Sequence, residues 1–246
     1  MQIQIDIKNG FIYKDFLTIS LYLCKNIKKM ITKILSQLAP YGAHLIAVSK
    51  TKSVAAVQEI YDTGQRDFGE NYVQELVDKE ATMSKDIRWH FIGHLQSNKV
   101  KYIAPFVHLI HAVDSVSLLK EINKQAKKNE RIIDVLLQVK INDEPTKFGF
   151  DDEEINTFFA ENQHLTLENV NIVGMMGMAT FTDNLTQIRS EFQHLKRIFD
   201  HVKNTFLIEK KDFKHISMGM SDDYPIALEE GATLIRIGSL IFGKRN

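Results

Sequence analysis

The stretch His44-Leu45-Ile46-Ala47-Val48-Ser49-Lys50-Thr51-Lys52 is an apolar strand that ends in two lysines. Alternate residues of a strand share a face, so Ile46, Val48 and Lys50 point to one side. A lysine cation on the core side of a buried strand is costly, and two interpretations follow. Either Lys50 reaches past the strand end into water, or it is a neutral, nucleophilic amine of the Schiff-base type, which burial and the nearby charge of Lys52 favour.

The same pattern, an apolar run followed by a helical stretch or a helical turn, recurs eight times along the chain. The runs cover residues 44–48, 66–71, 88–93, 108–114, 132–141, 170–180, 215–220 and 233–238. No linker rich in proline, glycine or serine divides them. Eight such units predict one parallel (β/α)8 TIM barrel. The alternative, an open doubly wound sheet, rarely needs so many units.

Capping residues predict where several helices begin. Ser53 precedes one helix, Asp151 and Glu154 form a capping box before another, and Ser221 precedes a third that ends at Gly231. Residues 97–106 are also predicted as a helix. Apolar residues at spacings of three and four make residues 185–202 the clearest helix of the sequence.

Composition excludes several classes of function. The 246 residues include 31 basic and 31 acidic side chains, so the net charge is zero. Nucleic acids and membrane surfaces attract proteins with a basic excess, so neither partner is expected. The single cysteine, Cys24, excludes a disulfide scaffold and suits a reducing, cytoplasmic location.

The N-terminal segment is not predicted to be a signal peptide or a membrane span. Lys14 and Asp15 interrupt its apolar residues, and no cleavage pattern follows. Residues 17–38 instead predict one or two helices that cover an end or flank of the domain. Met30 suggests a second hypothesis, in which translation begins there and residues 1–29 are a dispensable extension. Residues 30–246 would then form the single domain.

Functional groups of such a barrel gather where its strands end. Two of the predicted strands end in short turns of glycine and serine, residues 217–221 and 236–239. The backbone N–H groups at Gly219 and Gly238 can bind a phosphate, with hydroxyl donors from Ser217 and Ser239. The alternative is that the two glycines only permit tight turns. Asp222 and Asp223 would repel a dianion at the next helix, so the phosphate is expected over the glycine turns.

Arg236 shares a strand face with Leu234 and Gly238 and is therefore predicted to point toward the barrel mouth. A buried arginine needs an acceptor, either a carboxylate such as Glu70 or a ring nitrogen of a ligand. A cofactor with an aldehyde, a phosphate and a pyridine nitrogen would use Lys50, the glycine turns and Arg236, and that cofactor is pyridoxal phosphate. An arginine leaves the pyridine nitrogen unprotonated, so the ring is a weak electron sink.

A metal site is not predicted. His90 and His94 have a spacing of four, but on a strand and its exit they do not form a helical metal pair, and no carboxylate accompanies them at ligand spacing. His108 and His111 fall on opposite faces of their strand.

Five ordered motifs resemble those of the pyridoxal phosphate homeostasis proteins. They are Ala47-Val48-Ser49-Lys50-Thr51-Lys52, Phe68-Gly69-Glu70-Asn71-Tyr72-Val73-Gln74-Glu75, Trp89-His90-Phe91-Ile92-Gly93-His94-Leu95-Gln96-Ser97-Asn98-Lys99, Ser217-Met218-Gly219-Met220-Ser221-Asp222-Asp223 and Arg236-Ile237-Gly238-Ser239. The resemblance runs from about Met30 to the C-terminus and implies a barrel of the alanine racemase N-terminal domain type.

The resemblance also implies roles for single residues. It makes Lys50 the Schiff-base lysine, sets Arg236 against the pyridine nitrogen and places Asn71 near the ring. The residues that it implies around the phosphate are Ser217, Met218, Gly219, Gly238 and Ser239.

The family implies a cytoplasmic, monomeric carrier of pyridoxal 5'-phosphate in vitamin B6 homeostasis, with no catalytic residue. Apo-enzymes that use this cofactor are the expected recipients. The racemases of the resembling fold take a second base from an added domain, and here only residues 244–246 follow the last barrel element, the closing helical turn of residues 239–243. The alternatives are a pyridoxal phosphate-dependent amino-acid racemase or lyase, and a cofactor-free Schiff-base aldolase.

Overall fold

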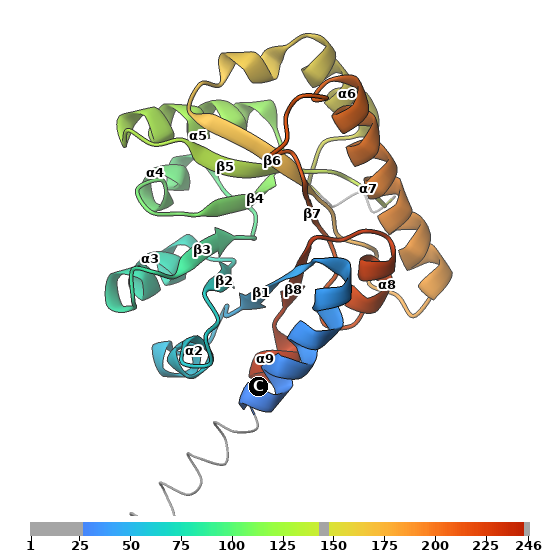
Figure 1. Cartoon of the computed structure of the whole chain (residues 1–246). Helices are drawn as coiled ribbons and strands as arrows, with labels where there is room; N and C mark the ends of the chain where they lie inside the picture. Colours follow the sequence, from blue (N-terminus) through green and yellow to red (C-terminus); the bar gives the residue numbers. More distant parts are fainter. Residues whose placement is uncertain (1–26, 143–147, 244–246) are drawn as a thin grey trace, which may run out of the picture.

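The computed structural model describes residues 27–142 and 148–243, and its strands form one closed parallel barrel in chain order, with β1 paired to β8 (Figure 1). The strands are β1 (His44–Val48), β2 (Asp67–Glu70), β3 (Arg88–Phe91), β4 (Leu109–Val113), β5 (Ile133–Gln138), β6 (Val170–Met176), β7 (His215–Ser217) and β8 (Leu234–Ile237). The closure confirms the predicted TIM barrel and excludes the open doubly wound sheet.

Helices follow the strands and surround the barrel (Figure 1). They are α2 (Val54–Tyr61), α3 (Val73–Thr82), α4 (Val100–Ile103), α5 (Val116–Lys128), α6 (Asp152–Ala160), α7 (Leu185–Thr205), α8 (Tyr224–Glu229) and α9 (Ser239–Phe242), with short 3-10 turns η1 (Ala39–Tyr41), η2 (Ser97–Lys99) and η3 (Gln163–Thr166). The predicted caps of two helices are confirmed: Ser53 accepts from the Ala56 N–H, and Asp151 and Glu154 form a capping box.

Two apolar cores lie on the two sides of the barrel wall. The inner core is small and includes Ile46 and Leu234, whereas Ala47 belongs to the large core between strands and helices. Ile46 is the register partner of Arg236 on β8. The alternation predicted for the first and last strands is therefore present, and it directs Arg236 inward.

Two predicted helices are shorter in the structure. Residues 97–106 contain only η2 and α4. After β7 the helix begins at Tyr224 and not next to Ser221, because the Asp223 carboxylate turns back and accepts from the Met220 N–H at 2.5 Å. Residues 221–223 therefore form a turn that leaves the strand end open.

A helix over residues 27–38 covers one flank of the barrel (Figure 1). Its residues Ile31, Ile34 and Leu38 are buried, and Gln37 accepts from the Tyr224 hydroxyl of α8 at 2.8 Å. This part of the predicted covering helix is confirmed. Residues 1–26 lie outside the described residues, so a start at Met30 stays a prediction.

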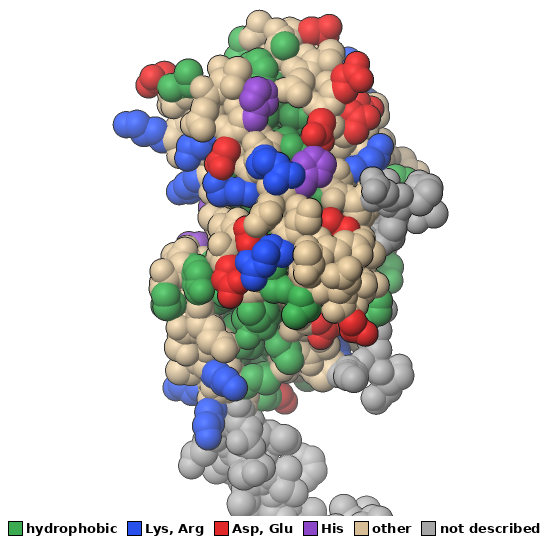
Figure 2. All heavy atoms as spheres, turned by 90° about the vertical axis from the view of Figure 1, so that its right-hand side faces the viewer, with side chains coloured by type: hydrophobic (Ala, Val, Ile, Leu, Met, Phe, Trp, Pro, Cys, Tyr) green, Lys and Arg blue, Asp and Glu red, His purple; other side chains and the backbone are tan. Residues whose placement is uncertain are grey.

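The outer face over α7 and α8 carries interspersed acidic and basic side chains, as the balanced composition predicts (Figure 2). Arg189 of α7 pairs there with Glu229 and Glu230. Within residues 27–142 and 148–243, no helix is both long and apolar enough to cross a membrane.

Candidate functional site

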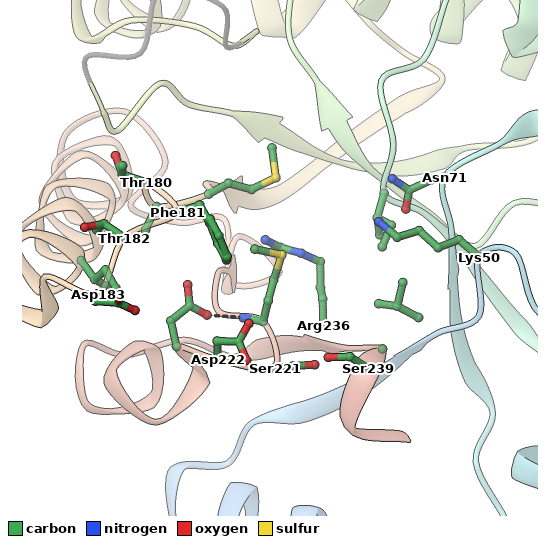
Figure 3. A pocket seen from close by; sticks show the side chains of 18 of the residues that line it. Lys50, Asn71, Thr180, Phe181, Thr182, Asp183, Ser221, Asp222, Arg236 and Ser239 are labelled. Atoms are coloured by element: carbon green, nitrogen blue, oxygen red, sulfur yellow. Dashed lines mark hydrogen bonds between the residues drawn. The ribbon is translucent and has the colours of Figure 1, made fainter. Parts of the chain in front are cut away.

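A cavity of about 650 Å³ opens at the end of the barrel where the strands end. Lys50 after β1, Asn71 after β2, and Arg236, Gly238 and Ser239 at the end of β8 line it (Figure 3). We call it the mouth cavity. Its size is typical of pockets that hold small molecules or cofactors. Five of the eight residues predicted from the sequence therefore share one cavity, although they come from three strands.

The other three predicted residues lie behind the cavity wall. Ser217 and Met218 are fully buried, and Gly219 adopts a φ of 89° at the turn after β7. The Ser217 hydroxyl is bonded to Arg236 and His111 inside the barrel. The hydroxyl is engaged in these two contacts, and its expected role as a donor to a phosphate stays a prediction.

The turn that carries Lys50 is anchored on both sides. The preceding Ser49 donates its hydroxyl hydrogen to Glu70 Oε1 at 2.6 Å, and the backbone N–H of the following Thr51 donates to Glu75 Oε1 at 2.6 Å. Thr51 has a φ of 64°, a conformation that a non-glycine residue keeps only when its surroundings hold it. The lysine side chain therefore starts from a fixed backbone.

Lys79 of α3 completes this anchor. Its Nζ donates to the Ser49 carbonyl at 2.8 Å and to Glu70 Oε1 and Glu75 Oε1 at 2.7 Å each. Burial raises the pKa of Glu70, while the charge of Lys79 and the hydroxyl of Ser49 act against this rise. Sequence patterns do not identify Lys79 as a functional residue. Its one signal in the sequence is its spacing of four from Glu75, which is the last residue of the motif Phe68–Glu75.

Arg236 projects from β8 into the mouth cavity (Figure 3). Its Nη1 donates to Ser217 Oγ at 2.6 Å, and its Nη2 donates to the Gly177 carbonyl at 3.2 Å. The alternative in which Glu70 is the carboxylate partner of this arginine is excluded, because Glu70 is held by Ser49 and Lys79. Burial lowers the pKa of Arg236 to about 10, which still leaves it charged at neutral pH.

The two aspartates after β7 differ in position. Asp223 is buried and accepts from the Met220 N–H, as the dashed line in Figure 3 shows, and burial raises its pKa. Both aspartates line the mouth cavity, where Asp222 is exposed. One backbone donor of the β7 turn is therefore already engaged, whereas Gly238 and Ser239 line the cavity on the neighbouring strand end.

Asn71 supplies a polar group without a partner among the described residues. Its Oδ1 is buried and accepts no hydrogen bond. Its backbone is also fixed, because a Cβ on Gly93 would lie 2.4 Å from the Asn71 carbonyl oxygen. Because an unpaired buried acceptor is costly and Asn71 lines the mouth cavity, a molecule bound there can supply a donor.

His90 and His94 do have carboxylate partners in the structure, although none is found near them at ligand spacing in the sequence. Within the described chain, Asp67, His90 and His108 place one possible ligand atom each within 4.8 Å of one another. Asp67 is already engaged, since it accepts from His90 and, through both oxygens, from Arg88. A guanidinium at this carboxylate repels a metal cation, so we assign the cluster as an ion pair. His94 Nδ1 lies 3.0 Å from Asp114 Oδ2.

Comparisons with known proteins agree with the barrel fold. Residues 24–246 match the family model described as alanine racemase, N-terminal domain. A protein of Aquifex aeolicus named pyridoxal phosphate homeostasis protein is 41% identical over 204 residues, which cover 82% of this chain and 87% of that protein.

Solved structures extend the comparison. PipY of Synechococcus elongatus, solved without pyridoxal phosphate, is 35% identical with a TM-score of 0.82, over 88% of this chain and all of PipY. The PipY structure with pyridoxal phosphate bound has a TM-score of 0.79 at 34% identity and the same coverage. Alanine racemase of Streptomyces coelicolor shares the fold at 14% identity and a TM-score of 0.67, over 90% of this chain and 59% of that protein.

Proposed function

Because the chain belongs to the family of pyridoxal phosphate homeostasis proteins, within the alanine racemase N-terminal domain family, we propose that it binds pyridoxal 5'-phosphate in the mouth cavity and buffers or delivers it. One observation carries the proposal: Lys50, Arg236 and the turn at Gly238 and Ser239 face the same cavity. When bound, the cofactor supplies an aldehyde that reacts reversibly with an amine. An amine, a cation and backbone donors match its aldehyde, ring nitrogen and phosphate.

Lys50 is the residue proposed to hold the aldehyde carbon. Its turn is fixed by the contacts of Ser49 and Thr51 with Glu70 and Glu75, so its amine is presented to the cavity in a defined place. Lys52 also lines the cavity, but its Nζ donates to the Phe242 carbonyl at 3.1 Å. The fixed turn and the strand-end position of Lys50 support Lys50 over Lys52 as the amine that binds.

Arg236 is proposed to donate to the ring nitrogen. An arginine has only donors and keeps its charge, so it can bind this nitrogen only when the nitrogen carries no proton. Without that proton the ring withdraws electrons weakly, which suits storage of the cofactor better than carbanion chemistry. This supports a carrier and not a catalyst.

The phosphate is proposed to lie against the turn at Gly238 and Ser239. The N–H groups of Ser239 and Leu240 begin helix α9, and the first N–H groups of a helix have no acceptor within it. The Ser239 hydroxyl adds a donor. The backbone of Ser217, Met218 and Gly219 is proposed to support this site from behind the cavity wall, and the buried Asp223 carboxylate already accepts a hydrogen bond from the Met220 N–H.

Asn71 is proposed to contact the ring. Its buried Oδ1, which has no partner among the described residues, can accept from the ring hydroxyl, which is the one further polar group that pyridoxal phosphate carries.

We further propose apo-enzymes as recipients, the cytoplasm as location and a monomer as the working state. The balanced charge and the single cysteine support the location.

A lysine replacement tests the assignment. Borohydride reduction of the cofactor-loaded protein, followed by peptide mapping, should find a pyridoxyl group on Lys50. Lys50→Ala should lose that group, whereas Lys52→Ala, the matched control from the same cavity, should keep it. A protein without any adduct at Lys50 would overturn the cofactor assignment and favour a cofactor-free aldolase.

Turnover separates a carrier from an enzyme. We expect transfer of the bound cofactor to an apo-enzyme and no racemisation or elimination of amino acids by the purified protein. Turnover at the usual rates of enzymes, about 1 to 1000 per second, that disappears in Lys50→Ala would establish the racemase or lyase alternative.

A further inference from the structure

A line of hydrogen-bonded side chains crosses the inside of the barrel, through a core that is otherwise apolar. From Arg236 Nη1 it runs to Ser217 Oγ at 2.6 Å, and from Ser217 Oγ to His111 Nδ1 at 2.9 Å. His111 Nε2 then meets His90 Nδ1 at 3.0 Å, and His90 Nε2 meets Asp67 Oδ1 at 3.0 Å. We call these five residues the Asp67–Arg236 chain.

The Asp67–Arg236 chain joins the two ends of the barrel. Arg236 lines the mouth cavity, whereas Asp67 is the first residue of β2 and therefore lies at the opposite end. The five residues come from β8, β7, β4, β3 and β2. All except Asp67 are buried, and the most exposed of these buried residues, Arg236, is 4% exposed. At the far end, Arg88 also binds Asp67.

The two ends of the chain fix the direction of every donor. An arginine can only donate, and an ionised carboxylate can only accept. Burial acts against ionisation of Asp67, but hydrogen bonds from His90 and Arg88 outweigh it and lower its pKa. Arg236 therefore donates to Ser217, Ser217 to His111 Nδ1, His111 Nε2–H to His90 Nδ1, and His90 Nε2–H to Asp67.

The reverse order between the two histidines requires a charged imidazole. If His90 Nδ1–H donated to His111, its Nε2 would need a second proton to face the Asp67 carboxylate. Burial lowers the pKa of His90 and of His111, with Asp67 opposing this effect at His90. Two neutral imidazoles, each with its proton on Nε2, therefore satisfy all the groups.

We propose that Ser217, His111, His90 and Asp67 are positioning residues that hold the Arg236 guanidinium toward the ring nitrogen of the cofactor. This rests on the proposed function. The acceptors of Arg236 given above, a hydroxyl and a carbonyl, are neutral, so its orientation depends on the Ser217 hydroxyl. With its hydrogen donated to His111 Nδ1, that hydroxyl presents its lone pairs to Arg236 and no hydrogen that would compete for the same place. The Asp67 carboxylate sets this polarity from the far end.

The chemical shifts of the histidine ring nitrogens, measured by NMR on the cofactor-free full chain, directly test the direction of these hydrogen bonds. We expect both His90 and His111 to be neutral with the proton on Nε2. Asp67→Asn provides an amide that can also donate to His90, so the Nδ1–H form should gain population at His111, which does not contact Asp67. His108→Gln is the control, because His108 packs on His90 at a ring distance of 5.3 Å outside the chain. A doubly protonated His90, or an unchanged His111 in Asp67→Asn, would overturn the proposal.

Cofactor binding supplies the second measurement. Ser217→Ala removes the acceptor of a charged donor and should weaken pyridoxal phosphate binding by about 10-fold, with His108→Gln unchanged. Ser217→Ala that folds and binds as tightly as the parent would refute a positioning role. If the parent chain itself binds no pyridoxal phosphate, the proposed function fails, and the NMR result on the cofactor-free chain still decides the donor direction.

Discussion

Lys79 shows how one buried residue determines the geometry of another. It is 3% exposed although it lies on a surface helix, and its ammonium group donates to Ser49, Glu70 and Glu75. An ammonium has three donors, so this environment satisfies it completely. Since these contacts hold the residues on both sides of Lys50, Lys79 acts on the mouth cavity without lining it.

Lys79→Met should therefore destabilise the fold by about 3 to 5 kcal/mol, because it leaves Glu70 buried without its cation. It should also reduce the yield of the Lys50 adduct, since the Ser49 carbonyl loses its donor. Urea unfolding measures the first effect. Lys85→Met is the control: Lys85 pairs with Glu80 but is 66% exposed, so its loss should cost less than about 1 kcal/mol. Equal destabilisation by both variants would contradict the anchoring role.

At the scale of elements, the turns after β7 and β8 form the part of the cavity that the phosphate is proposed to use. Gly219 has a φ of 89°, and a Cβ there would lie 2.5 Å from the Ala227 Cβ of α8. The β7 turn therefore requires glycine twice, for its backbone conformation and for the close approach of α8.

Gly219→Ala should cost more than backbone strain alone. Gly42, with a φ of 63° and no atom within 4 Å of a built Cβ, provides the matched control. Gly42→Ala should cost about 1 kcal/mol from the left-handed conformation, and Gly219→Ala about 1 to 3 kcal/mol more from overpacking. Unfolding free energies measure both costs. The same loss in the two variants would mean that α8 moves aside without resistance.

Sequence periodicity located every strand of the barrel, because the apolar alternation that defines a strand is local. It placed the strand ends too late: β7 ends at Ser217 although residues 215–220 were predicted, and the remaining residues form the turn at the cavity. The start of α8 was predicted too early, since the contact of Asp223 with Met220 depends on three-dimensional packing.

The predicted site residues were found from their position at strand ends, which is a general property of this fold. Their partners could not be found in this way. Ser217 and His111 are 106 residues apart, and Lys79 and Ser49 are 30 apart, so no local pattern connects them. Pairing Arg236 with Glu70 failed for the same reason: both side chains are buried, but on different sides of the barrel wall.

At the scale of the whole molecule, the two ends of the barrel have different chemistry. The mouth cavity carries Lys50 and Arg236, whereas the opposite end contains His90, His108 and His215, whose pKa values are all lowered, first of all by burial. Histidines that are buried as neutral groups must take up protons when the chain unfolds in acid. The end without the cavity is therefore expected to control the stability of the barrel in acid.

His215 allows this expectation to be tested. Its pKa falls from an ordinary value of 6.5 to about 4, through burial and then the charge of Lys214, and its Nδ1 is buried without a partner among the described residues. Between pH 6.5 and 4, His215 is protonated in the unfolded chain but stays neutral in the folded chain. The stability that depends on neutral His215 is therefore complete above pH 6.5 and is lost as the pH falls toward 4. His215→Gln should flatten the decline of the unfolding free energy with falling pH by about 1 to 2 kcal/mol, a range reduced for solvent screening at this partly exposed side chain.

Urea unfolding at several pH values measures this decline. His201→Gln, at an exposed position on α7, is the control and should leave the decline unchanged. A decline in His215→Gln as steep as in the parent would assign the acid sensitivity to His90, His108 and His111 instead.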